Sequence, residues 1–120
     1  MPADANVAPS AESAERALSL LGEMSADMRA GAILGAGGEV LASDGPADAW
    51  AERVGAVLEQ ADAAADDPAE HIHIATEAGE LFLTRRDGLT VAAITERFVL
   101  ASLMSFDMRS VLTDLAAEAP

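Results

Sequence analysis

The chain has 120 residues, of which 51% are hydrophobic and 3% aromatic, so it can form one globular domain and is too apolar to be intrinsically disordered. It has 21 acidic residues against 7 lysines and arginines, and its net charge of -14 disfavours nucleic acid and anionic membranes as partners. Cysteine is absent, which excludes disulfides, thiolate catalysis and most structural zinc sites.

Residues 1–9 are small and polar and contain two prolines, which predicts a flexible tail before a single domain over residues 10–117. The tail has neither the basic start nor the apolar run of a signal peptide. We therefore expect a cytoplasmic protein.

A helix is predicted to begin at Ser10, a candidate N-cap. Apolar residues then recur at three- and four-residue steps, as they do on one face of a helix. The expected buried residues are Ala14, Ala17, Leu18, Leu21, Met24 and Met28.

A hairpin is predicted next, with strands over residues 29–36 and 39–43. The first strand is apolar throughout, so we expect other elements to cover both of its faces. Gly37 and Gly38 are candidates for a two-residue loop between the strands. The glycines at 35–38 lack the spacing, the following helix and the lysine of phosphate-binding loops, so they predict a turn and no cofactor site.

Pro46 is well placed to open a helix over residues 47–65, and the apolar stripe of that helix consists of Trp50, Val54, Val57, Leu58 and Ala61. The outer side carries Asp48, Glu52, Glu59 and Asp62, with Ala51 and Gly55 between them. Glycine inside a helix lowers the stability of the helix by about 1 kcal/mol. In one interpretation, a close crossing with another backbone at Gly55 offsets this cost. The alternative interpretation is a solvated flank.

Three more strands are predicted as a meander over residues 71–76, 80–86 and 89–95. The first alternates histidine with isoleucine, which places His71 and His73 on one face and Ile72 and Ile74 on the other. Asp87-Gly88 indicates a tight hairpin between the last two strands.

The last predicted helix covers about residues 96–117, and its core stripe is Leu100, Ala101, Met104, Met108, Val111, Leu112 and Leu115. Val99, Leu103 and Phe106 form a second apolar line on the opposite side. Packing against the first helix explains this line in one interpretation, and a docking surface for a partner explains it in the other.

The hairpin RAGAILGAGGEVLASDG, the amphipathic helix after it, the segment HIHIATEAGELFLTRRDGLTVAAI and the terminal helix resemble a bacterial or archaeal roadblock (dynein light-chain-type) domain, over about residues 12–117. Longin and profilin-like domains share part of this layout. The resemblance implies a three-layer α/β/α (α+β) domain with a five-stranded antiparallel sheet in the order α-β-β-α-β-β-β-α.

The resemblance also implies a non-enzymatic homodimeric adaptor or regulator of a small Ras-like GTPase or signalling scaffold, in bacterial signalling or polarity. In such a dimer, the third strand pairs with its own copy and the second helices lie together as a platform. The third strand here has neither proline nor lysine, so it is a poorly protected edge. The expected dimer interface is His71, Ile72, His73, Ile74, Ala51 and Gly55. The expected partner-binding residues are Asp48, Glu52, Glu59, Val99, Leu103 and Phe106.

The alternative hypothesis belongs to a different class of function. In it, the chain is a profilin-like domain that senses a ligand or metal, with His71 and His73 as the binding site. Two imidazoles fall short of the three or four ligands of ordinary metal sites, so we expect no metal and no cofactor. An enzyme is the weakest class, because no nucleophile, base and orienting group occur at a recognisable spacing.

Overall fold

A computed structural model describes residues 9–118. The tail predicted for residues 1–9 lies outside the described residues, except for Pro9, which is buried. The elements follow in the predicted order: α1 (Ala11–Met24), β1 (Met28–Leu34), β2 (Val40–Ser43), α2 (Ala47–Ala64), β3 (His71–Ala75), β4 (Glu80–Arg86), β5 (Leu89–Thr95) and α3 (Ala101–Glu118).

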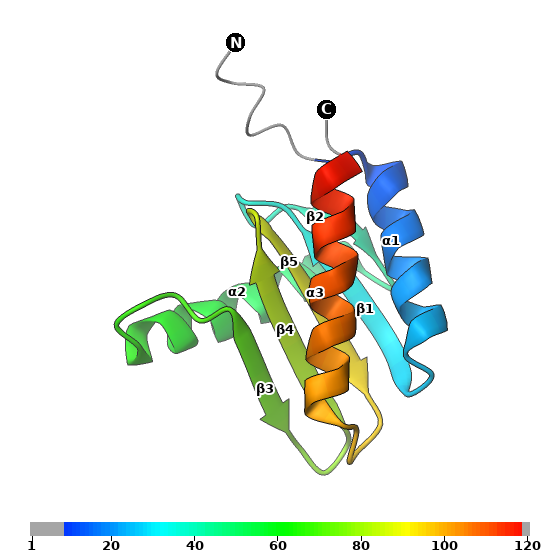
Figure 1. Cartoon of the computed structure of the whole chain (residues 1–120). Helices are drawn as coiled ribbons and strands as arrows, with labels where there is room; N and C mark the ends of the chain where they lie inside the picture. Colours follow the sequence, from blue (N-terminus) through cyan, green and yellow to red (C-terminus); the bar gives the residue numbers. More distant parts are fainter. Residues whose placement is uncertain (1–8, 119–120) are drawn as a thin grey trace.

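The strands form one antiparallel sheet in the order β2-β1-β5-β4-β3, so β3 lies at one edge. Helices α1 and α3 cover one face of the sheet and α2 covers the other (Figure 1). This confirms the predicted three-layer α/β/α arrangement and the meander of the last three strands.

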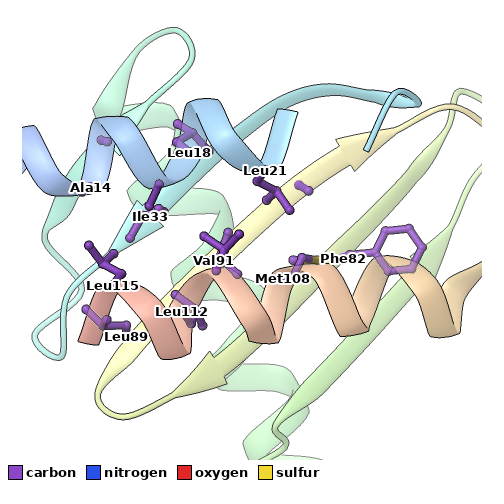
Figure 2. Packing of buried hydrophobic residues seen from close by; sticks show 14 of the residues in the cluster. Ala14, Leu18, Leu21, Ile33, Phe82, Leu89, Val91, Met108, Leu112 and Leu115 are labelled. Carbon is purple, nitrogen blue, oxygen red and sulfur yellow. The ribbon is translucent and has the colours of Figure 1, made fainter. Parts of the chain in front are cut away.

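The two faces of the sheet carry separate apolar cores. On the first face, side chains of α1 and α3 meet Ile33 and Val91 of the central strands (Figure 2). On the second face, Trp50 and Val54 of α2 pack on a floor that includes Ala32 and Ala92. Ile33 and Ala32 are neighbours on β1 and are both fully buried, which confirms that this strand is covered on both faces.

The two hairpin loops differ from each other. Asp87 and Gly88 have φ angles of 54° and 78°, as a two-residue hairpin turn requires, so the predicted tight turn is confirmed. The two-residue loop predicted at Gly37 and Gly38 is wrong, because residues 35–39 separate β1 from β2. The carboxylate of Glu39 folds back to accept a hydrogen bond from the Gly37 N–H at 3.0 Å, and Gly38 alone in this loop has a positive φ, 85°.

Two predicted helix boundaries are wrong. Helix α1 ends at Met24, where the Ser25 N–H donates to the Leu21 carbonyl, so Met28 belongs to β1 instead of the helix face. Helix α3 begins at Ala101 and not near residue 96, because Phe98 has a φ of 64° that no right-handed helix contains. Leu100, predicted in the core, is consequently 66% exposed.

We expect two glycine-to-alanine substitutions to change stability in opposite directions. A Cβ at Gly31 of β1 lies 2.9 Å from the Ala92 carbonyl oxygen and 3.0 Å from Leu18 Cδ1, whereas a Cβ at Gly22 of α1 has no atom within 4 Å. Gly31→Ala should lower the free energy of unfolding by about 1–3 kcal/mol through overpacking. Gly22→Ala should raise it by up to about 1 kcal/mol through helix propensity. Urea titration of both variants measures this, and a stabilised Gly31→Ala protein contradicts the close approach.

Candidate functional site: an open sheet edge and its neighbours

The outer side of β3 carries backbone groups without a sheet partner. The Arg85 N–H donates to the Glu70 carbonyl at 2.8 Å, and the Thr76 N–H donates to the Gly79 carbonyl at 2.9 Å. Hydrogen-bonded pairs alternate along an antiparallel ladder, so residues 71, 73 and 75 direct their N–H and C=O groups away from β4. The described residues place no strand beside them.

An apolar row on the α2 face leads to this edge. Ile74, Leu81, Ile94 and Ala30 lie side by side in the register of β3, β4, β5 and β1. All four are incompletely buried, and Ile74 is 38% exposed. The adjacent row is covered instead, because α2 lies over Leu83 and Ala92. The C-terminal end of α2 extends past β3 in Figure 1.

His71 and His73 lie on the opposite face of β3, the side of α3, which confirms the predicted alternation. The His73 ring stacks on Phe82, with ring centroids 4.3 Å apart and planes at 8°, and its Nε2 lies 2.5 Å from Glu80 Oε1. His71 Nδ1 lies 3.1 Å from Thr84 Oγ1. Among residues 9–118 no group of three metal-ligating side chains occurs.

Glu80 is a buried, hydrogen-bonded residue beside the open edge that the sequence reasoning missed. The residue is 6% exposed, and its carboxylate accepts hydrogen bonds from the Phe98 and Val99 N–H groups, in addition to its contact with His73. The pKa of Glu80 is lowered, mainly by the hydrogen bond from His73. Burial raises this pKa, and the hydrogen bonds from the two backbone N–H groups lower it further. Glu80 therefore ties the sheet edge to the connection before α3. The available signal was a glutamate in the same alternation as Phe82 and Thr84, which face the core.

The stabilisation by Glu80 should depend on pH. Because its folded-state pKa is lowered, its contribution is present above the ordinary pKa of glutamate, about 4.3, and is lost as the pH falls below that value. Glu80→Gln should therefore destabilise the protein at pH of about 6 and lose most of this effect by pH of about 3. Chemical denaturation of both proteins across this range measures the difference, and a difference that is constant with pH contradicts the assignment.

The acidic residues predicted on α2 lie at the surface. Asp48, Glu52 and Glu59 are exposed, and no basic side chain within the described range forms an ion pair with them. Ala51 and Gly55 line a hollow of about 680 Å³ between α2, the 35–38 loop and the turn after β4. A Cβ at Gly55 has no atom within 4 Å, so no backbone of the same protomer crosses there. The dimer-interface role of Ala51 and Gly55 stays a prediction.

The apolar line predicted on α3 is present in part. Leu103 and Phe106 are 55% and 54% exposed, so packing against α1 does not cover them. Val99 does not continue the line, because it precedes the helix and packs against the core. Phe98 and Leu100 are exposed nearby, and we call Phe98, Leu100, Leu103 and Phe106 the apolar patch.

Within residues 9–118, no helix combines the length and the hydrophobicity that crossing a lipid bilayer requires.

Solved structures with this fold are found, although no protein-family model and no curated protein sequence matches the chain. The gliding protein MglB of Thermus thermophilus is 16% identical, with a TM-score of 0.75 over 90% of this chain and 89% of that chain. A roadblock/LC7 domain from Streptomyces avermitilis is 13% identical, with a TM-score of 0.68 over 86% of this chain and 94% of that chain. The profilin LokiProfilin2, solved in a complex with rabbit actin, is 11% identical, with a TM-score of 0.63 over 86% and 95%. The chain therefore has a roadblock-like α+β fold.

Proposed function

We propose that this chain, whose fold is that of the roadblock domains, is a non-enzymatic homodimeric adaptor or regulator that binds a small Ras-like GTPase in a signalling or polarity system. The open edge of β3, with the apolar row beside it, is the observation that supports the proposal most. A surface that offers unpaired strand groups and incompletely covered isoleucine and leucine side chains suits association with another chain. The proposal assigns no catalytic residue and no cofactor.

The outward groups of β3 fit a second copy of the same strand. In antiparallel pairing about a two-fold axis at His73, residue 71 of one protomer lies opposite residue 75 of the partner subunit. Both of these residues have outward N–H and C=O groups, so the ladder is completed without a shift of register. The same axis carries the projecting end of each α2 towards the apolar row of the partner subunit. Strand pairing and apolar burial then reinforce each other.

We expect Ala75→Pro to weaken the dimer at least about tenfold. Proline removes the outward N–H at position 75 and leaves the ladder with β4 intact, since edge strands tolerate proline at such positions. Ile74→Lys should have a similar effect by placing a charge on the apolar row. Ala75→Ser and Ile74→Val serve as controls. Light scattering against the protomer mass of 12.3 kDa measures the assembly, and a wild-type monomer contradicts the dimer.

The GTPase part of the proposal rests on the resemblance to roadblock domains and on two exposed surfaces. One is the acidic flank of α2, defined by Asp48, Glu52 and Glu59. The other is the apolar patch at the start of α3. Both surfaces are available in the protomer and lie outside the open edge of β3. An adaptor needs such separate surfaces in order to bind a partner while it remains a dimer.

Binding to a Ras-like GTPase tests this part directly. We expect the tagged wild-type chain to retain a purified Ras-like GTPase of the same genome more strongly in one nucleotide state than in the other. Leu103→Ser combined with Phe106→Ser should reduce retention at least about tenfold and leave the unfolding midpoint and the dimer mass unchanged, because both side chains are half-exposed. If no such GTPase is retained in either nucleotide state, this part is wrong and the dimer is unaffected.

A further inference from the structure

The hollow beside α2 has an apolar base, and small residues form its walls. Leu34 and Val54 lie at its base and are nearly fully buried, and Leu58 is half-buried. The upper walls include four glycines, which are Gly35, Gly38, Gly55 and Gly88. The volume of about 680 Å³ lies within the range of about 300–1,000 Å³ that is usual for ligand pockets. The hollow therefore has room for a side chain that this protomer does not supply.

Negative charge surrounds this hollow, although two arginines line it. Arg85 forms a salt bridge with Asp62, with N–O distances of 2.6 and 3.0 Å, and also donates a hydrogen bond to the Ala69 carbonyl. Arg86 approaches Glu70 at 3.4 Å and Asp87 at 3.9 Å. Each guanidinium therefore has a carboxylate neighbour that offsets its charge, Asp62 for Arg85, and Glu70 and Asp87 for Arg86.

The acidic flank of α2 adjoins the same hollow. Asp48 stands seven residues before Gly55 and Glu59 four residues after it, so both lie within about 40° of Gly55 around the helix. Glu52 lies about 60° away on the same side. The three carboxylates have no ion-pair partner in the described part of the chain. The surroundings of the hollow therefore favour basic groups next to whatever enters it.

We infer that the hollow takes an apolar side chain from a protein partner, flanked in the partner's sequence by arginine or lysine. The apolar base excludes water around the inserted side chain, and the neighbouring carboxylates attract the flanking cations. This inference rests on the proposed adaptor function and adds the chemistry of the partner's contact segment. It also assigns Gly55 a second role, because a residue without a side chain at this position keeps the hollow open.

Four of the chain's glycines line the hollow and others lie elsewhere, which provides an internal comparison. The probe is the peptide GRRLRRG, added to the full-length protein labelled with 15N. We expect larger shifts of the amide signals of Gly35, Gly38, Gly55 and Gly88 than of Gly22, Gly31, Gly45 and Gly79. The shifts should shrink several-fold as NaCl rises from about 50 to about 300 mM, since flanking charge contributes. The peptides GRRGRRG and GEELEEG should produce much smaller shifts.

A variant pair tests the position of the site. Gly55→Leu places a side chain at the wall of the hollow, where a Cβ meets no atom within 4 Å, and it should reduce the shifts at least about threefold. Ala56→Leu, on the next exposed residue of α2 and outside the hollow, should leave them unchanged. Equal shifts at all glycines, equal binding of the acidic peptide, or unchanged binding by Gly55→Leu overturns the inference.

Light scattering of the same samples separates the two proposals. If Gly55→Leu dissociates an otherwise dimeric protein, Gly55 lies in the dimer interface and the hollow is not a partner site, which overturns the inference and leaves the dimer standing. If the wild type is monomeric but the peptide shifts follow the expected pattern, the dimer proposal fails and the hollow is supported.

Discussion

The unpaired backbone of β3 is the constraint on which the functional interpretation depends. Strands β1, β5 and β4 each lie between two strands, and the short edge strand β2 contacts both α1 and α2, but the outer groups of residues 71, 73 and 75 have no partner strand in the described chain. Backbone donors and acceptors at a sheet edge are satisfied by water or by another strand. The half-exposed apolar row beside them favours the strand, because water cannot compensate for exposed isoleucine and leucine.

Glu80 connects this edge to the second exposed surface. One carboxylate oxygen contacts His73 on β3, and the other accepts hydrogen bonds from the Phe98 and Val99 N–H groups in the connection between β5 and α3. Phe98 has an unfavourable positive φ, which these hydrogen bonds help to hold. The same buried carboxylate that contacts the edge strand therefore helps to hold Phe98, one residue of the apolar patch, in its exposed position. The carboxylate of Glu80 thus contacts residues of both surfaces, the open edge of β3 and the apolar patch.

Most of the fold could be predicted from local patterns, whereas the site could be predicted only in outline. The alternation at residues 71–76 and the Asp87-Gly88 turn depend on neighbouring residues, and the structure confirms both. The start of α3 could not be predicted, because a distant carboxylate stabilises the backbone at Phe98 against the helical periodicity around it. The hollow at Gly55 was also missed, since its opposite wall comes from loops far away in the sequence.

Alanines between the layers have a consequence for assembly. Ala32 and Ala92 are fully buried in the cluster beneath α2, so at these two positions the sheet contributes only a methyl group to the space under that helix. A larger side chain at either position lifts the helix, and the end that reaches past β3 then moves with it. In the proposed dimer, the thickness of this core would therefore set the height at which α2 approaches the partner subunit, through residues that lie away from the subunit contact.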